Sequence, residues 1–291
     1  MKNYLYRSLT VILFVSFWLA GCTPRTKTVS KNNVEWDSIH IEKTYHLQDD
    51  PNNPSCNLQI HFIFPFKYEN KEVLEAIQRH FLRSSFGDSY ENLTPGGAVE
   101  RYVELYLDDY KSLESDFLAE KEKGHKHEEH EHEYEASNSW FSYYEELENE
   151  ILYDKNDILC YSVSYEKYTG GAHGSHACYK HVIDLATGLE IKEKDIFTEG
   201  YQEPLAEILV NKIAEKNRLK NAKELEEIGF FSIDEIYPND NFSIDDTGLT
   251  YYFNEYEIAA YVIGMTQVHL PYGEIKHLLR EDNKIALLTG N

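Results

Sequence analysis

Few basic residues and few cysteines mark this 291-residue chain, which has 28 Lys and Arg against 51 Asp and Glu, and four cysteines. A net charge of −23 repels phosphate backbones and anionic lipid, so we expect no nucleic-acid partner. The same charge attracts cationic partners, although solubility is the commoner reason for it. Four cysteines do not make a disulfide framework in a chain of this length. The fold must therefore rest on a buried core, for which 23 Tyr and 14 Phe supply aromatic bulk.

Long apolar runs are also scarce, and the clearest one lies at the amino terminus. Residues 9–20 are apolar, follow Lys2 and Arg7, and are too few to span a membrane. The end of this run and the two residues after it read Leu-Ala-Gly-Cys over 19–22, which resembles a bacterial lipobox. We therefore expect residues 1–21 to be a lipoprotein signal peptide and Cys22 to carry the lipid that anchors the protein to a membrane. An ordinary signal peptide with a chance cysteine is the alternative.

The residues after Cys22 bear on location and redox state. Thr23 follows the lipidated position, which resembles lipoproteins delivered to the outer membrane, so we expect a cell-envelope protein that faces the periplasm. Residues 22–35 are mostly polar and read as a tether. Lipidation of Cys22 leaves three other cysteines, an odd number, so at least one thiol has no partner in the chain.

Hydrophobic periodicity predicts an α+β fold, with an antiparallel sheet packed against a few helices. Strands are expected over 36–47, 56–66, 139–153, 158–168 and 176–185, on both sides of a turn at 245–248, and over 266–272. Helices are expected over 71–82, from Thr94 onward, over 203–220 and over 273–280. Short turns between successive strands favour antiparallel pairing.

The stretch YTGGAHGSHA at 168–177 has the composition of a functional loop. It lacks the lysine of a phosphate-binding loop and the GxSxG frame of a nucleophile elbow. His173, His176 and His181 would supply metal ligands, but no spacing rule selects them. The favoured interpretation is a structural turn, in which glycines allow positive φ and a ring nitrogen of His173 bonds a loop carbonyl. A partner-contact loop is the second interpretation.

A charged tract at 121–135 interrupts the predicted helical pattern. Its histidines alternate with carboxylates, and both groups bind Zn²⁺. The four imidazoles that would take part are those of His125, His127, His130 and His132. The tract lacks the HExxH pattern of zinc proteases, so at most weak zinc binding is expected, and a solvated charged loop is the simpler interpretation. No other cofactor is predicted.

Four motifs together carry a resemblance to a known family. They are YTGGAHG at 168–174, DLATGLEIKEKDIF at 184–197, FNEYEIAAYVIG at 253–264 and VHLPYGEIKHLL at 268–279. In this combination the chain resembles the extracytoplasmic domain of RsiV-type anti-sigma factors. Its marker loop comprises Tyr168, Thr169, Gly170, Gly171, Ala172 and His173. The resemblance implies an α+β fold and, for that loop, a possible role in partner contact.

The part before this domain is similar to the companion domain of PdaC-type deacetylases. We therefore predict a PdaC-like region over 36–138 and an RsiV-like domain over 139–285, which together form one globular unit. RsiV-type proteins bind lysozyme, so the resemblance implies a partner such as lysozyme, a cationic protein, or a peptidoglycan component. The chain shows neither the sigma-binding segment and membrane helix of those factors nor the Asp-Asp plus HxxxH set of the deacetylases. We therefore expect a non-catalytic binding lipoprotein. A cell-wall hydrolase or deacetylase accessory unit, and weak metal binding, are the alternatives.

Overall fold

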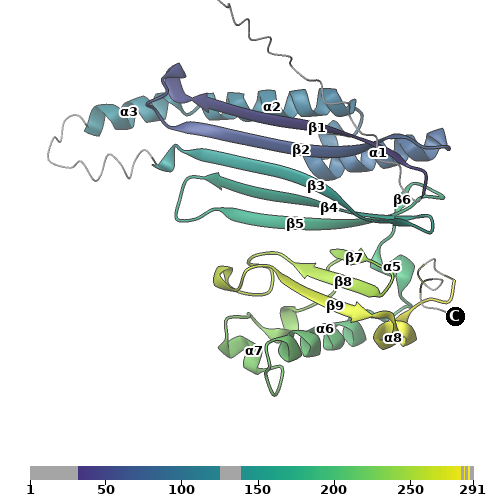
Figure 1. The fold of residues 1–291 in the computed structure, drawn as a ribbon. Coiled ribbons are helices and arrows are strands. Elements are labelled where there is room, and N and C mark those ends of the chain that lie inside the picture. Colours follow the sequence, from purple (N-terminus) through teal and green to yellow (C-terminus); the bar gives the residue numbers. More distant parts are fainter. Residues whose placement is uncertain (1–31, 125–138, 283–284, 286–287, 289–291) are drawn as a thin grey trace, which may run out of the picture.

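The computed structural model describes residues 32–124, 139–282, 285 and 288. Within these residues the chain forms a six-stranded sheet, a three-stranded sheet and helices that cover both (Figure 1). The predicted α+β class is confirmed. Cys22 and the four histidines of the charged tract lie outside the described residues. No helix among the described residues is long and apolar enough to cross a membrane.

The large sheet follows the order of the chain. Its strands are β1 (Glu35–His46), β2 (Ser55–Lys67), β3 (Tyr143–Lys155), β4 (Ile158–Thr169), β5 (Ser175–Asp184) and β6 (Leu189–Glu190). All neighbours pair antiparallel except β2 and β3, which are parallel. A parallel pair needs a long crossover, and the helical segment between these two strands supplies it.

Three helices form that crossover: α1 (Lys71–Phe86), α2 (Pro95–Lys111) and α3 (Glu114–Gly124). The Asn70 side chain accepts hydrogen bonds from the first amides of α1. The Thr94 hydroxyl accepts one from the amide of Gly97, and Pro95 occupies the first turn of α2. These caps satisfy amides that have no partner inside a helix, which explains why both helices begin where the sequence predicts.

One face of the large sheet packs on these helices. Alternate side chains of β2 are fully buried there, as the period of two predicts: Leu58, Ile60 and Phe62. Ile77 and Phe81 of α1 belong to the same hydrophobic core. The amphipathic helices therefore cover the apolar face of the strands, while the other face of β1, β2 and β3 presents polar side chains.

The remaining elements form a smaller layered unit. The strands of the second sheet are β7 (Phe242–Ile244), β8 (Gly248–Phe253) and β9 (Thr266–Pro271), in that order and antiparallel. Its helices are α5 (Glu193–Ile196), α6 (Gln202–Lys216), α7 (Glu224–Glu227) and α8 (Tyr272–Ile275). Short 3-10 turns occur at Leu47–Asp49, Asp88–Tyr90, Ile233–Glu235, Tyr261–Ile263 and Lys276–Leu278.

The closing helix predicted over 273–280 is present but shorter than predicted. Helix α8 ends at Ile275, and one 3-10 turn follows it. The carbonyl of Leu278 accepts from the amide of Thr198, and the amide of Arg280 donates to the carbonyl of Ile196. These tertiary hydrogen bonds replace the bonds along the chain that a continuing helix requires.

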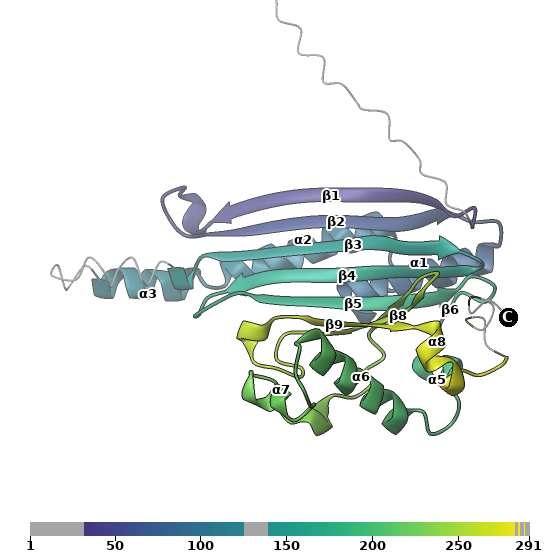
Figure 2. The ribbon, with the colours of Figure 1, turned by 60° about the horizontal axis from the view of Figure 1, so that its bottom comes forward.

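The two sheets meet along the outer edge of β5, with the small sheet beside that strand (Figures 1 and 2). Strand β6 covers only the last part of this edge. Further along, the amides of His176, Cys178 and Lys180 donate to the side chains of Glu255, Asn254 and Asn241, at 3.2, 2.7 and 2.8 Å respectively. These side chains thus accept the hydrogen bonds that a neighbouring strand would accept, and the backbone amides along this edge of β5 are not left without partners.

The three cysteines of the described residues, Cys56, Cys160 and Cys178, are buried, and none forms a disulfide. Burial raises the pKa of the Cys56 thiol to about 11 and that of Cys160 to about 12. Both thiols therefore stay protonated at neutral pH and act as small apolar side chains.

Candidate partner-binding surface

The marker loop connects β4 to β5 at the end of the molecule where the β8–β9 connection also lies (Figure 1). Gly170 and Gly171 have φ values of 85° and 107°, which side chains other than glycine rarely adopt. A Cβ at Gly170 would also lie 2.8 Å from the carbonyl oxygen of Trp140. The predicted turn is present, and close backbone approach explains the first of its glycines.

His173 holds the loop to the β8–β9 connection. Its ring stacks on Tyr261 with centroids 4.0 Å apart and planes at 20°, and Tyr256 lies on the same stack. Its Nδ1 lies 2.8 Å from the carbonyl oxygen of Gly174, which is the kind of loop contact the sequence suggested. The Tyr168 hydroxyl donates to the carbonyl of Gly171 at 2.8 Å. These contacts support the structural interpretation of the loop.

The three histidines near this loop do not converge. His176 Nδ1 lies 3.1 Å from Glu255, and its Nε2 lies 3.4 Å from Glu166. His181 is five residues further along β5, so it projects from the opposite face of the sheet. A metal site built from His173, His176 and His181 is therefore excluded by the geometry.

Several large apolar side chains are exposed around the loop. The exposed fractions are 63% for Trp140, 56% for Tyr256, 86% for Val262 and 37% for Met265. They come from segments that contact the marker loop or belong to the β8–β9 connection. We call Trp140, residues 168–174, Tyr256, Tyr261, Val262 and Met265 the loop surface. Clustered exposed apolar groups of this kind mark interaction sites.

A small cavity of about 260 Å³ adjoins the loop surface. Met265 and His176 line it together with three carboxylates on the polar face of the sheet: Glu146, Glu148 and Glu166. Ser164 also lines it but donates its hydroxyl to Cys178 Sγ at 3.1 Å, not to His176. The cavity is thus acidic, and its serine is not paired with a histidine base.

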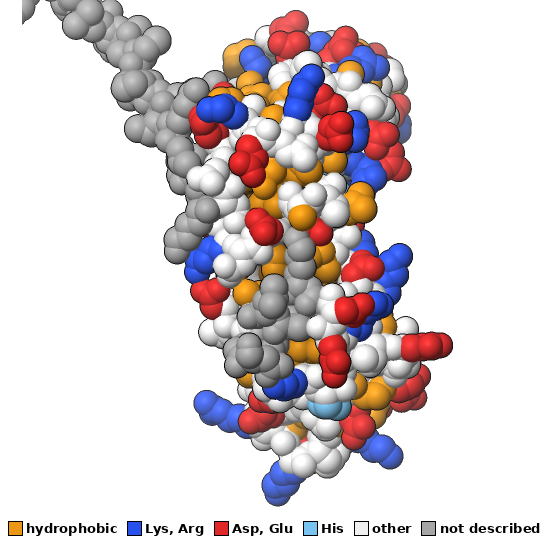
Figure 3. Space-filling view, turned by 90° about the vertical axis from the view of Figure 1, so that its right-hand side faces the viewer, with side chains coloured by type: hydrophobic (Ala, Val, Ile, Leu, Met, Phe, Trp, Pro, Cys, Tyr) orange, Lys and Arg blue, Asp and Glu red, His pale blue; other side chains and the backbone are white. Residues whose placement is uncertain are grey.

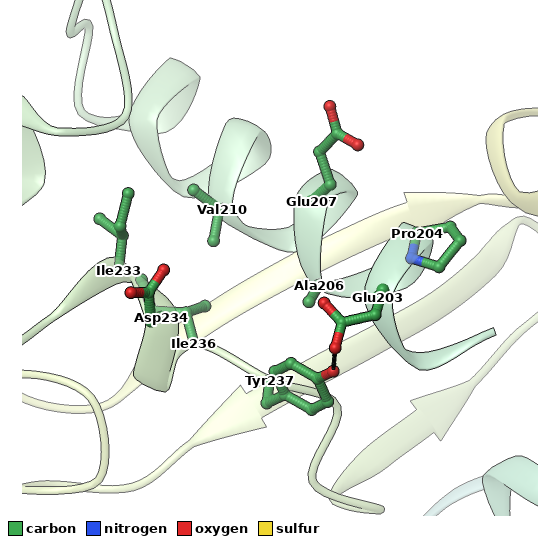
Figure 4. Close-up of a pocket in the computed structure, with 9 residues that line it drawn as sticks. All are labelled: Glu203, Pro204, Ala206, Glu207, Val210, Ile233, Asp234, Ile236 and Tyr237. Atoms are coloured by element: carbon green, nitrogen blue, oxygen red, sulfur yellow. Dashed lines mark hydrogen bonds between the residues drawn. The ribbon is translucent and has the colours of Figure 1, made fainter. Parts of the chain in front are cut away.

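A second, larger hollow of about 630 Å³ lies between α6 and the segment at 233–237 (Figure 4). Apolar groups, including Val210 and Ile236, line it beside the carboxylates of Glu203, Glu207 and Asp234. The Tyr237 hydroxyl donates to Glu203, as the dashed line in Figure 4 marks. No Lys or Arg is among the residues that line either hollow. Both concave regions therefore favour cationic groups.

Sequence reasoning selected the 168–173 loop but missed its neighbours. Trp140 follows the charged tract, and nothing in its surroundings distinguishes it from a core tryptophan. Tyr256, Tyr261 and Val262 lie inside the motif at 253–264, which carried the family resemblance without any assigned role. Only the β4–β5 and β8–β9 connections, brought together by the fold, define one surface.

Comparison with known proteins gives two family matches. The family described as "Protein of unknown function (DUF3298)" matches residues 194–273, and the family described as "Deacetylase PdaC" matches residues 52–176. The PdaC match extends through β3 and β4, beyond the division predicted at residue 138. Together the two matches indicate an extracytoplasmic accessory-domain protein. No curated protein matches the chain.

Two solved structures resemble the whole fold. A DUF3298 family member from Bacteroides fragilis is 31% identical, with a TM-score of 0.81 over 90% of this chain and 100% of that chain. A DUF3298 family protein from Pseudomonas aeruginosa is 12% identical, with a TM-score of 0.56 over 84% of this chain and 94% of that one, which shows likeness of fold alone. On the identity and coverage of the Bacteroides fragilis structure, this chain belongs to the DUF3298 family.

Proposed function

We propose that this protein is a lipid-anchored envelope protein that binds a lysozyme-like cationic protein through the loop surface and catalyses no reaction. The observation that carries the proposal is the exposed group Trp140, Tyr256 and Val262 beside an acidic cavity. Anchoring at Cys22 would hold this surface in the periplasm, at the outer membrane.

Aromatic side chains at the centre of an interface supply much of its binding energy, because they bury large areas with little loss of freedom. Tyr256 is already held by stacking on Tyr261, so little ordering is needed when a partner covers it. The carboxylates of Glu146, Glu148 and Glu166 would steer a basic partner toward this end. The resemblance to RsiV-type domains points to lysozyme as the first probe.

The alternative of a deacetylase or hydrolase accessory unit draws on the PdaC match. It predicts turnover of peptidoglycan or of acetylated sugars, whereas a binding protein for the cell wall would hold peptidoglycan without turnover. The hydrogen bond from Ser164 to Cys178 Sγ, in place of one to His176, supports the binding proposal over hydrolysis by a serine nucleophile.

The test is binding of purified chain from residue 23 onward to immobilised hen lysozyme, with an unrelated basic protein of similar charge as the comparison. Val262→Asp and Tyr256→Ala are expected to weaken lysozyme binding at least tenfold. Leu93→Asp alters a side chain that is 41% exposed between the first two helices, and it should bind as the parent does. Equal retention of both basic proteins, or no effect of Val262→Asp, would refute specific recognition.

Two further measurements separate the remaining possibilities. Sedimentation with peptidoglycan sacculi tests the cell-wall alternative, which is favoured if the chain pellets with sacculi but ignores lysozyme. Cys22→Ala in the full-length chain tests the anchor, because it should move the protein from the membrane fraction to the soluble fraction. Unchanged fractionation would refute anchoring through Cys22.

A further inference from the structure

Three metal-ligating side chains meet at the other end of the molecule, away from the loop surface. His80 comes from α1, His181 from β5 and Glu190 from β6, and one ligand atom of each lies within 4.8 Å of the others. Their side chains are only 8%, 17% and 16% exposed respectively. The group lies near the β6 end of the large sheet, on the right in Figure 1. None of the three residues belongs to the marker loop or to the charged histidine tract.

A chain of hydrogen bonds orients His80. The Ser84 hydroxyl lies 3.2 Å from the carbonyl oxygen of Phe81. A carbonyl oxygen can only accept, so Ser84 donates its proton there. Ser84 Oγ must then accept from the Tyr161 hydroxyl, 2.8 Å away. The Tyr161 oxygen in turn accepts from His80 Nδ1 at 2.7 Å. All three bonds form together only if Nδ1 carries the proton.

The other nitrogen of His80 is thereby directed at Glu190. His80 Nε2 is buried, forms no hydrogen bond among the described residues, and lies 3.4 Å from Glu190 Oε2. In neutral His80 this nitrogen is a lone pair that faces a carboxylate. A lone pair and a carboxylate oxygen at this distance repel each other, so the arrangement calls for a cation between them. A proton or a metal ion would meet that demand.

His181 completes the donor set. Its Nδ1 lies 2.7 Å from Glu190 Oε1, and its ring stacks on Tyr161. A hydrogen bond on the second ring nitrogen is typical of metal-bound histidine, and Tyr161 supplies it to His80.

We propose that His80, His181 and Glu190 form a zinc site that clips α1 to the β5–β6 end of the sheet. Two imidazoles and one carboxylate are a donor set that zinc accepts, with water at the fourth position. Tetrahedral ligands about 2.0–2.1 Å from zinc lie about 3.3 Å apart, close to the 3.4 Å between His80 Nε2 and Glu190 Oε2. On binding, zinc takes the place of the proton between His181 Nδ1 and Glu190, and the neutral His181 ring carries its proton on Nε2 instead.

Lys192 is the competitor for this site. Its Nζ lies 2.8 Å from Glu190 Oε2, and its side chain is 34% exposed. Lys192 therefore neutralises Glu190 when no metal is present, and it has a path to solvent when one binds. Figure 3 shows acidic and basic side chains on both edges of this end of the molecule.

The test uses the chain from residue 23 onward, with the tract histidines changed to Gln so that they contribute no metal affinity. The four changed positions are His125, His127, His130 and His132. Zinc titration by calorimetry measures affinity and stoichiometry, and Co²⁺ absorption reports tetrahedral coordination. We expect one zinc per chain and a rise in the thermal midpoint, because zinc binds the folded state.

Glu190→Gln and His181→Gln should each weaken zinc binding at least tenfold and abolish the cobalt spectrum. Lys192→Met should tighten binding, a gain that misfolding cannot imitate. Glu42→Gln is the matched control, because it alters an exposed His–Glu pair, between His40 and Glu42 at 3.1 Å, and should leave zinc affinity unchanged. Zinc affinity that is equal in Glu190→Gln and the parent, or absent from both the parent and Lys192→Met, would overturn the proposal.

Discussion

Replacing Asn241 by Ala tests whether side chains take the place of a strand along β5. Asn241 is only 8% exposed, and its Oδ1 accepts from the amide of Lys180 at 2.8 Å. Its Nδ2 donates to the carbonyl oxygens of Cys178 and Tyr252, each at 3.0 Å. The Tyr252 carbonyl keeps a second donor, Asn239 Nδ2 at 2.9 Å. Asn241→Ala therefore leaves two buried groups without their side-chain partner.

An unpaired buried amide costs about 1–3 kcal/mol and a lost carbonyl bond about 1 kcal/mol. We therefore expect the free energy of unfolding to fall by about 3 kcal/mol, a change of roughly 150-fold in the equilibrium constant. For a domain of this size the thermal midpoint should fall by about 6–12 °C. Urea unfolding followed by far-UV circular dichroism and by tryptophan fluorescence measures the change.

Two companion variants sharpen the test. Asn241→Asp keeps the acceptor for Lys180 but sets an oxygen against the Cys178 carbonyl, so it should destabilise at least as much as the alanine variant. Asn52→Ala removes an exposed side chain that bonds only its own turn, and it should change stability by less than about 0.5 kcal/mol. A loss below about 1 kcal/mol in Asn241→Ala would refute the view that its side chain replaces a neighbouring strand along β5.

Three other outcomes are expected. Gly170→Ala should lower the free energy of unfolding by about 2 kcal/mol or more, because backbone strain and a clash act together. Gly171→Ala carries the same kind of strain with open space around the new Cβ, so it should cost about 1 kcal/mol. Equal thermal midpoints for the two variants would contradict this difference. His173→Ala should lower the free energy of unfolding by about 1 kcal/mol, because the stack on Tyr261 is lost. His173→Phe should keep most of that stability in urea unfolding, and a phenylalanine variant as unstable as the alanine variant would argue against stacking. Burial raises the pKa of Asp245, but hydrogen bonds from its own turn have the larger combined effect, so the pKa lies below the ordinary 3.8. The stabilisation by ionised Asp245 is thus complete above the pKa of the unfolded chain and is lost as pH falls through the lower pKa of the folded protein. Plots of unfolding free energy against pH for Asp245→Asn and the parent should therefore converge in acid and separate above about pH 4. Parallel plots would contradict the lowered pKa of Asp245.

Local patterns predicted most of the secondary structure because the forces that set it act over short distances. Alternating apolar residues in β2 bury one face, and the caps at Asn70 and Thr94 begin the first two long helices where expected. The glycine pair in the marker loop likewise predicted a turn between two strands. These features depend on neighbours within a few residues, and they needed no knowledge of the rest of the fold.

Tertiary contacts decided the rest, since no local pattern reports what lies far along the chain. The helical crossover makes β2 and β3 parallel, and backbone bonds to Ile196 and Thr198 end the last helix early. The loop surface exists only because the β8–β9 connection folds over the marker loop. His80 and Glu190 are 110 residues apart in the sequence; His80 falls in a predicted helix, and Glu190 falls in no predicted element. Only the packing of α1 against the sheet brings them together, because side chains distant in sequence meet where burial joins the elements that carry them.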